Sequence, residues 1–322
     1  MQNKILDILI NADDYISGQE ISKRLGVSRQ AIWKAVNALK EKDYVIDSVT
    51  NKGYRLVSSP PYLNERAIKS NLNTKIIGSE VIVLETTTST NDYLKKLGSS
   101  GCKNGTVVAA REQVSGKGRL GRLWQAKKDE CIAFSFLLRP NIAPSEVAAI
   151  TPLAGLAVCK ALRKFTGIDC KLKWPNDIIV GRKKLVGILT EMSAEFDGVE
   201  YIVTGIGINA DAKEFPEEIS KKATSLMLET GIATDKNKLL SCVLEQIEAD
   251  FISNNLTLSE NALEEYKDLC ATIGRNVTFC RGDKQLGGIA VGVDKNGELK
   301  VMQNDGTVCL VNSGEVTVQG IY

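Results

Sequence analysis

Residues 116–122 read Gly-Lys-Gly-Arg-Leu-Gly-Arg, and this glycine-rich basic stretch does most to decide the class of fold. Its pattern matches the GxGxxG of dinucleotide-binding folds. The next strand-like run begins as soon as Ile132, however, which leaves too short a connection for the helical crossover of a βαβ unit. A protein-kinase loop is also excluded, because the catalytic loop of a kinase needs a histidine and the chain has none.

The same stretch has the properties of an anion-binding loop. Its glycines let the backbone approach a ligand closely, and Lys117, Arg119 and Arg122 supply positive charge. Together they suit the clamping of a carboxylate and a phosphate. A mobile basic surface loop would have the same composition, so other motifs must decide between the two interpretations.

Composition limits the chemistry further. The chain has 322 residues, of which 43% are hydrophobic and 25% charged, which predicts a folded chain of more than one domain and excludes a fibre or a disordered protein. A net charge of +2 means that any contact with nucleic acid must come from a local patch. With 0 histidines, Ser-His-Asp, Cys-His and HExxH sites are excluded, so catalysis must rely on Lys, Arg, carboxylates and backbone.

The cysteines and the apolar runs indicate the compartment. The 8 cysteines are spaced too widely for a CxxC pair or a zinc knuckle, and we expect them to be small buried side chains in a reducing cytosol. No stretch approaches the roughly 18 apolar residues of a membrane span. The sequence therefore predicts a cytoplasmic protein with no membrane contact.

The first 57 residues follow the order of a winged helix-turn-helix. Ser17 opens a second helix that Gly26 closes, Ser28 caps a third, and a hairpin with a basic turn at 50–53 follows. This order places polar side chains on one face of the third helix and at the hairpin tip, where they could read DNA: Ser28, Arg29, Gln30, Lys34, Asn37 and Lys52. The alternative is a small helical packing module whose surface charges are merely solvated. Trp33 could equally lie in the core of this region or contact DNA.

Two further regions follow the Ser58-Ser59-Pro60-Pro61 linker. Irregularly alternating strands and helices, among them helices at 147–166 and 236–254, predict an α+β core over 62–269. Short strands and tight turns over 270–322 predict a small all-β barrel. The predicted domains are thus 1–61, 62–269 and 270–322.

Four more polar motifs lie in the α+β region. Lys173-Trp174-Pro175-Asn176-Asp177 leads into a strand, and Lys184 begins the otherwise apolar strand 184–191, which places an ammonium group at the end of the sheet. The strand Gly205-Ile206-Gly207-Ile208-Asn209 ends in an amide. A turn rich in hydroxyl groups at 86–91 precedes a helix.

In this order the motifs resemble those of the bifunctional biotin protein ligases, also called biotin operon repressors, over essentially the whole chain. The resemblance implies a winged helix, a central ligase domain of the class II synthetase-like biotin/lipoate ligase fold and a C-terminal SH3-like β-barrel. One departure stands out. The family loop is typically Gly-Arg-Gly-Arg-Arg-Gly-Arg, and here Lys117 and Leu120 replace two arginines. Lys117 keeps the charge without the planar fork, which puts bidentate clamping at 117 in doubt, while Arg119 and Arg122 retain it.

The resemblance also implies a two-step reaction in which biotin is adenylated with ATP and then transferred to a carrier lysine. Arg119, Arg122 and Lys184, with Mg²⁺, would be catalytic by stabilising negative charge. The implied biotin site consists of Ser89, Thr90, Asn91, Gln113, Lys117, Gly118, Arg119 and Lys184. The implied ATP site consists of Arg119, Arg122, Asn176, Lys184 and Asn209. No metal ligands are predicted.

The resemblance implies partners as well: a biotin carboxyl carrier protein, operator DNA, and a second copy of the chain once the adenylate is held. Residues 211–222 would be a lid over the adenylate or a plain surface loop. Two other functions stay open, a regulator that senses biotin without transferring it and a lipoate ligase.

Overall fold

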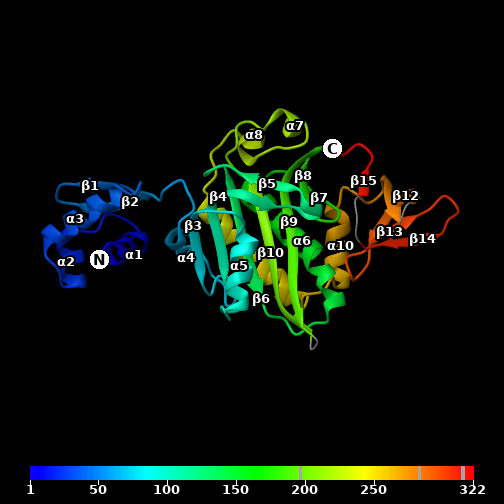
Figure 1. Cartoon of the computed structure of the whole chain (residues 1–322). Coiled ribbons are helices and arrows are strands. Elements are labelled where there is room, and N and C mark those ends of the chain that lie inside the picture. Colours follow the sequence, from blue (N-terminus) through cyan, green and yellow to red (C-terminus); the bar gives the residue numbers. More distant parts are fainter. Residues whose placement is uncertain (196–197, 282–283, 313–315) are drawn as a thin grey trace.

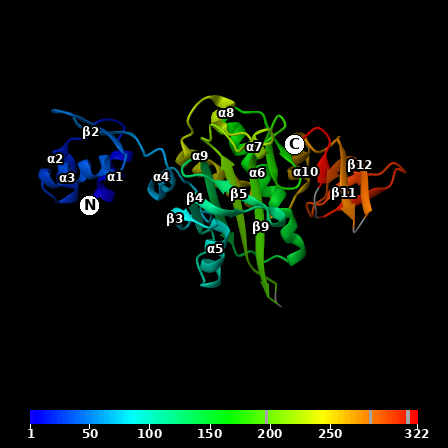
Figure 2. The ribbon, with the colours of Figure 1, turned by 45° about the horizontal axis from the view of Figure 1, so that its top comes forward.

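The computed structural model describes residues 1–195, 198–281, 284–312 and 316–322. Figures 1 and 2 both place the N-terminal helices on one side of a central sheet and the C-terminal strands on the other. The architecture is α+β, as predicted.

The N-terminal domain has the predicted order of elements. It consists of α1 (Gln2–Ile10), α2 (Gly18–Leu25), α3 (Arg29–Lys40), β1 (Val45–Val49) and β2 (Gly53–Ser58). The Ser17 hydroxyl accepts from Glu20 N and the Ser28 hydroxyl from Ala31 N, while Gly26 takes the left-handed conformation that ends α2. The apolar stripe predicted for α3 is buried in a core of its own: Ile32, Ala35, Val36 and Leu39.

The central domain is built on one mixed sheet. Among the described residues it has eight strands in the order β3-β4-β6-β10-β9-β8-β7, with β5 pairing with β4. β3 runs parallel to β4, and the other pairings are antiparallel. The strands are β3 (Val81–Thr87), β4 (Val107–Lys117), β5 (Leu123–Ala126), β6 (Cys131–Leu138), β7 (Cys170–Lys173), β8 (Asp177–Val180), β9 (Lys183–Glu195) and β10 (Gly198–Asn209).

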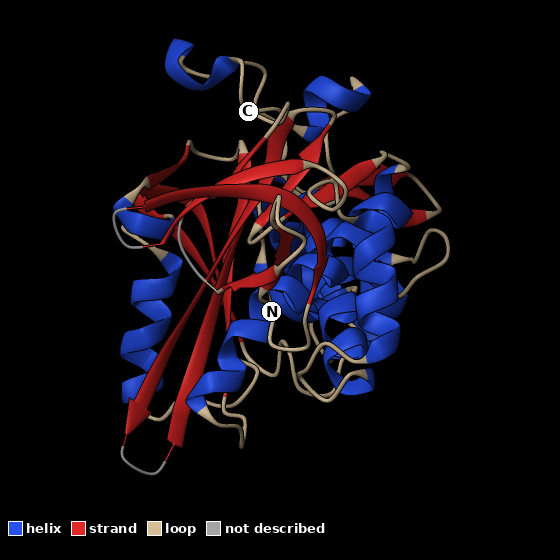
Figure 3. Cartoon of the chain, turned by 90° about the vertical axis from the view of Figure 1, so that its right-hand side faces the viewer, coloured by secondary structure: helices blue, strands red, loops and turns tan. Residues whose placement is uncertain are grey.

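Helices cover both faces of this sheet, as Figure 3 shows from the C-terminal side. Successive side chains of a strand point to opposite faces of the sheet. Val107 and Ala109 of β4 therefore face the main core, whereas Val108 faces a second hydrophobic cluster with Leu94 of α5 (Thr90–Ser99). The main core is covered by α6 (Ile150–Thr166) and α9 (Lys236–Ser253). The remaining helical segments are η1 (Arg119–Gly121), η2 (Pro144–Ala149), α4 (Glu65–Ser70), α7 (Glu217–Ser220), α8 (Leu226–Thr230) and α10 (Glu260–Leu269).

One expectation about apolar runs was wrong. The helical segment Pro144–Thr166 is long and apolar enough, by length and composition, to cross a membrane. The most apolar part of this segment is 72% buried inside the protein, where it packs against the sheet and α9. Apolarity on all sides is what a helix in the middle of a core requires, so the segment has the surroundings of a core helix.

The C-terminal domain is an antiparallel β domain whose core is continuous with that of the central domain. Its strands have the order β14-β13-β12-β11-β15, with bounds β11 (Asn276–Arg281), β12 (Lys284–Val293), β13 (Leu299–Met302), β14 (Val308–Val311) and β15 (Val316–Val318). Phe279 and Val301 belong to the same buried cluster as Trp174. Trp174 also donates from Nε1 to Gly297 O at 2.9 Å, so the KWPND segment lies where the two domains meet.

The cysteines depart in part from the expectation of burial. In the described part of the chain all are free thiols, with Cys131, Cys159, Cys170 and Cys270 buried. Cys280 is exposed on β11, and three others are half-buried. Cys159 and Cys170 bring their Sγ atoms within 3.8 Å although they come from a helix and a strand, a proximity that their spacing does not reveal.

Candidate active site

A cavity of about 860 Å³ opens at one end of the central sheet. Every residue predicted for biotin, for ATP or for catalysis lines it: Ser89, Thr90, Asn91, Gln113, Lys117, Gly118, Arg119, Arg122, Asn176, Lys184 and Asn209. These residues come from five separate parts of the chain, so the fold brings the sequence motifs together in one place. Their individual roles remain predictions.

The glycine-rich stretch is shorter as a loop than the sequence predicted. β4 continues through Lys117, and Gly116 pairs with Trp124 of β5. The turn is therefore confined to 118–122, where Gly118 N donates to Arg122 O at 2.7 Å and Leu120 adopts a positive φ of 56°. The pairing of β4 with β5 holds both ends of the turn beside the cavity. The turn therefore has less conformational freedom than a surface loop without such pairing.

Arg119 projects from this turn toward the KWPND segment. Its Nη1 lies 3.4 Å from Asn176 Oδ1, and Asn176 Nδ2 donates to Ile188 O at 2.8 Å. Burial lowers the pKa of the Arg119 guanidinium, whereas the nearby Asp177 carboxylate opposes that shift. A half-buried guanidinium therefore lies at the cavity beside the Asn176 amide, where a positive charge suits an anionic ligand.

Lys117 is paired differently from Arg119. Its Nζ lies 2.7 Å from Asp92 Oδ2 in the first turn of α5, and Lys95 pairs with the same carboxylate. Burial would raise the pKa of Asp92, but hydrogen bonds from Lys117 and Lys95 lower it. Lys117 thus joins the glycine-rich turn to α5 rather than extending freely into the cavity.

Lys184 stands at the start of β9, as its place in the sequence predicted. Its Nζ lies 2.6 Å from Asp177 Oδ1 and 5.4 Å from the centre of the Trp124 ring. Gly187 gives the side chain room, because a Cβ there would come within 3.1 Å of Lys184 Nζ. One carboxylate therefore balances a lysine that the cavity otherwise exposes to ligand.

A hydrogen-bond network fixes the start of α5. Ser89 caps the helix, and Gln113 Oε1 accepts from Thr90 N at 2.8 Å and from Thr90 Oγ1 at 3.2 Å. Sequence reasoning did not single out Ser135. Its Oγ lies 2.7 Å from Thr90 Oγ1 and 2.6 Å from Asn91 Oδ1, and it can donate its proton to either oxygen. With its oxygen engaged, Gln113 presents its amide nitrogen as the end that can donate to a ligand.

Glycines form the floor of the cavity under Trp124. A Cβ on Gly207 would come 2.3 Å from the indole, and one on Gly205 would come 2.1 Å from Asn91 Oδ1. The sequence showed these glycines within a motif, but their purpose depends on where Trp124 lies. They allow a flat aromatic ring and an amide to lie directly on β10.

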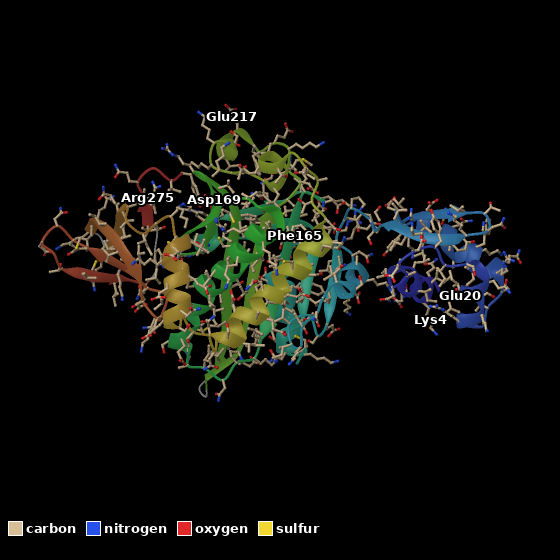
Figure 4. All side chains as sticks on the ribbon, turned by 180° about the vertical axis from the view of Figure 1, so that it is seen from behind. Lys4, Glu20, Phe165, Asp169, Glu217 and Arg275 are labelled. Carbon is tan, nitrogen blue, oxygen red and sulfur yellow. The ribbon has the colours of Figure 1, made fainter. Side chains whose placement is uncertain are left out.

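Residues 210–230 form a cap over one side of the cavity, with Phe215 and Ile219 among its lining. Asn209 Nδ2 donates to Thr224 O at 2.9 Å, and Thr224 N donates to Lys184 O at 2.9 Å. Lys236, only 3% exposed, pairs with Asp211. Figure 4 shows Glu217 of α7 at the outer end of this cap. The segment 211–222, for which the sequence left open a lid or a plain surface loop, therefore lines the cavity.

The C-terminal domain adds residues that sequence reasoning missed. Val316, Thr317 and Tyr322 line the same cavity. The Tyr322 ring centre lies 3.6 Å from Lys173 Nζ, and the Tyr322 hydroxyl hydrogen-bonds to Asp177 Oδ2. No motif marks these residues, because only the docking of two domains brings them to the site.

Most of the predicted DNA-reading side chains are exposed on the N-terminal domain. Ser28, Arg29, Gln30 and Lys34 are exposed, Asn37 is half-buried, and Lys52 is exposed in the turn between β1 and β2. Trp33 is 57% exposed, so it lies on the surface and outside the core of the domain. The geometry suits a helix that enters a groove of DNA, flanked by a basic hairpin.

Comparison with known proteins agrees with this geometry. Residues 83–209 match the biotin/lipoate A/B protein ligase family, residues 1–55 an HTH domain, and residues 272–318 the biotin protein ligase C-terminal domain. The chain is 35% identical to the bifunctional ligase/repressor BirA of Bacillus subtilis (strain 168), over 91% of each chain. It belongs to the bifunctional biotin ligase/repressor family.

A second bifunctional ligase/repressor and a solved biotin protein ligase are also similar to this chain. BirA of Escherichia coli (strain K12) is 29% identical over 98% of this chain and 96% of its own length. The biotin protein ligase of Aquifex aeolicus, solved in complex with biotin and ATP, has a TM-score of 0.64 and 30% identity over 75% of this chain and 99% of its own. The matches confirm the α+β fold class, with an HTH region, a ligase region and a C-terminal β region in that order along the chain.

Proposed function

We propose that this chain adenylates biotin with ATP and transfers the biotinyl group to a lysine of a biotin carboxyl carrier protein, and that it represses transcription by binding operator DNA. One observation carries the proposal: three cationic side chains, Arg119, Arg122 and Lys184, line the same cavity as the Ser89–Asn91 turn and Gln113. A cavity with cations at one part and neutral hydrogen-bonding groups at another suits an acid with a neutral polar head.

In the first step, a biotin carboxylate oxygen forms a bond to the α-phosphorus of ATP, and the bond to the bridging oxygen of pyrophosphate breaks. The reaction brings a carboxylate to a polyphosphate, so negative charge is concentrated in the transition state. Arg119, Arg122 and Lys184 would stabilise that charge from fixed positions. Ser89, Thr90, Asn91 and Gln113 would hold the ureido end, and Asn176 and Asn209 would hold the nucleotide.

In the second step, the amine of a carrier lysine attacks the carbonyl carbon of the mixed anhydride, and AMP leaves. The cap at 210–230 and the turn at 118–122 would keep water from the anhydride until the carrier arrives. The attacking lysine is supplied by the carrier, so the chain itself needs no imidazole. This agrees with the complete absence of histidine.

Mg²⁺ would accompany ATP as its counterion. Among the residues that the structure describes, no group of three His, Cys, Asp or Glu side chains could hold a metal ion. Mg²⁺ commonly keeps several waters and binds through substrate phosphates with only one or two carboxylates. The chemistry of the donor set thus fits a metal carried in with the nucleotide.

For repression, the exposed face of α3 would enter the major groove while the β1–β2 hairpin contacts the backbone. We propose that the bound adenylate favours a homodimer, which places two such helices on a palindromic site, and that the carrier protein competes with the dimer. We further propose that the chain works in the cytoplasm, which its free cysteines suit.

The decisive experiment incubates the purified chain with biotin, ATP, Mg²⁺ and a carrier domain. We expect the carrier to gain the mass of one biotinyl group. Lipoate in place of biotin, in a parallel reaction, distinguishes a lipoate ligase. A chain that binds biotin but leaves the carrier unmodified would instead be a sensor without transferase activity.

The repressor half of the proposal is tested by deleting residues 1–61. The N-terminal domain touches the central domain through few bonds, such as the 2.8 Å ion pair between Arg66 and Asp7 and the 3.1 Å bond from the Tyr62 hydroxyl to Lys42 O. We therefore expect ligation to persist and DNA binding to disappear. Unchanged DNA affinity in the truncated chain would show that the N-terminal domain is not the reader.

A further inference from the structure

Tyr322 connects the C-terminal domain to the charged end of the cavity. Its hydroxyl hydrogen-bonds to Asp177 Oδ2, while Asp177 Oδ1 lies 2.6 Å from Lys184 Nζ. Its ring lies 3.6 Å from Lys173 Nζ. A single tyrosine therefore contacts a lysine and the carboxylate that holds a second lysine.

The direction of the hydrogen bond follows from the environment of Tyr322. Burial and the neighbouring Asp177 carboxylate raise the pKa of the phenol far above its ordinary value. The hydroxyl is therefore protonated and donates to the carboxylate. This leaves one carboxylate oxygen to Tyr322 and the other to Lys184.

This division of Asp177 between two partners limits how much positive charge it neutralises. Lys173 and Arg119 both lie close enough to Asp177 for its charge to act on them. Without the tyrosine hydroxyl, the carboxylate could turn and take a second cation with the released oxygen. The cations would then be less available to a triphosphate.

The ring has a separate effect on Lys173. Lys173 is only 9% exposed, and this burial lowers its pKa to about 8. The Asp177 carboxylate opposes the shift but does not cancel it. A cation over an aromatic face is stabilised by the ring quadrupole. The Tyr322 ring therefore supports a charged lysine at a place where burial disfavours the charge.

We propose that Tyr322 is a positioning residue for the triphosphate of ATP: it holds Asp177 and Lys173 so that Lys184 and Lys173 face the phosphates. The inference rests on the proposed adenylation and adds to it that the C-terminal domain completes the ATP subsite. The predicted biotin side chains Ser89, Thr90 and Gln113 belong to the hydrogen-bond network at the start of α5. The link from Tyr322 to the predicted biotin site runs through Asp177 to Lys184, so we expect a larger effect on ATP than on biotin.

The test compares Tyr322→Phe, which keeps the ring, with Tyr322→Leu, which removes it. Pyrophosphate release gives kcat and the KM for ATP, and calorimetry gives the Kd for biotin without ATP. We expect Tyr322→Phe to raise the KM for ATP about tenfold, as the loss of one hydrogen bond to a charged group would. Tyr322→Leu should raise it at least about twofold more, with kcat changed less than KM and the Kd for biotin changed much less than the KM for ATP.

Tyr201→Phe is the matched control. In this variant the hydroxyl bonds to Ser99 at 3.0 Å and to Lys95 O at 3.2 Å are lost, but Tyr201 lies on β10 against α5 and is not among the residues that line the cavity. Its KM for ATP should stay at the wild-type value. Thermal melts of all variants show whether each is folded. If Tyr322→Leu is not folded, Tyr322→Phe, which keeps the volume of the ring, still tests the inference.

The outcomes separate the inference from the proposed function. An active wild type with an unchanged KM for ATP in Tyr322→Phe overturns the inference alone. Equal losses for biotin and ATP also overturn it, because they indicate general loosening. A wild type that releases no pyrophosphate with biotin overturns the proposed adenylation and this inference with it.

Discussion

The indole of Trp124 lies directly on Gly207, where a Cβ would come 2.3 Å from the ring. The contact places an aromatic wall against the floor of the cavity, beside Lys184, whose Nζ is 5.4 Å from the ring centre. Any side chain at 207 must therefore push Trp124 away from β10. A ring displaced from β10 would move into the cavity that it lines.

Gly207→Val should accordingly weaken biotin binding by at least about tenfold, because rigid overpacking at this site costs on the order of 1–3 kcal/mol. Calorimetry with biotin measures the change. Gly292→Ala is the control, since a Cβ there meets nothing closer than 3.9 Å. Full biotin affinity in Gly207→Val would show that Trp124 does not form the wall of the biotin site.

Lys184→Ala should reduce adenylate formation on the order of 10²-fold or more, the size seen when one group that stabilises transition-state charge is removed. Biotin binding should weaken much less, because Lys184 acts mainly on charge that develops during the reaction. Single-turnover pyrophosphate release and a biotin titration give the two numbers. Lys183→Ala, an exposed neighbour on the same strand, should behave as wild type. Equal losses of binding and rate in Lys184→Ala would contradict this role.

Much of this site could be predicted because its residues occur in short motifs. Ser17, Gly26 and Ser28 also marked helix boundaries correctly, since caps depend on local backbone chemistry. The 118–122 turn was predicted too long, because pairing of Gly116 with Trp124 extends β4 and involves a partner strand that the pattern did not reveal.

The residues that sequence reasoning missed depend on contacts between distant segments. Tyr322 reaches Asp177 only because the C-terminal sheet packs on the KWPND segment through Trp174 and Gly297. Ser135 matters because β6 lies opposite the start of α5. Neither position carries a local signal, so three-dimensional packing was needed to find them.

The pH dependence of ATP use should report Lys173. The pKa of this lysine is lowered to about 8, chiefly by burial. Below that pH its ammonium adds positive charge to the cavity, and above it the charge is lost, so kcat/KM for ATP should fall as pH rises through about 8. Lys173→Met should have a lower kcat/KM and lack this step. The same step in both proteins would assign it to another group.

Trp33 should report DNA binding directly. Its indole is 57% exposed on the face of α3 that carries Gln30 and Lys34, whereas Trp174 is only 1% exposed. A duplex selected from a random pool for binding to the chain in the presence of biotin and ATP should quench the Trp33 fluorescence. Trp33→Phe should abolish the quenching and weaken binding about fivefold, as the loss of one apolar contact with a base would. Trp124→Phe should keep the quenching, because that indole lies in the ligase cavity. Quenching that survives in Trp33→Phe and disappears in Trp124→Phe would mean that the signal comes from the cavity, and that α3 does not bring this side chain to the bases.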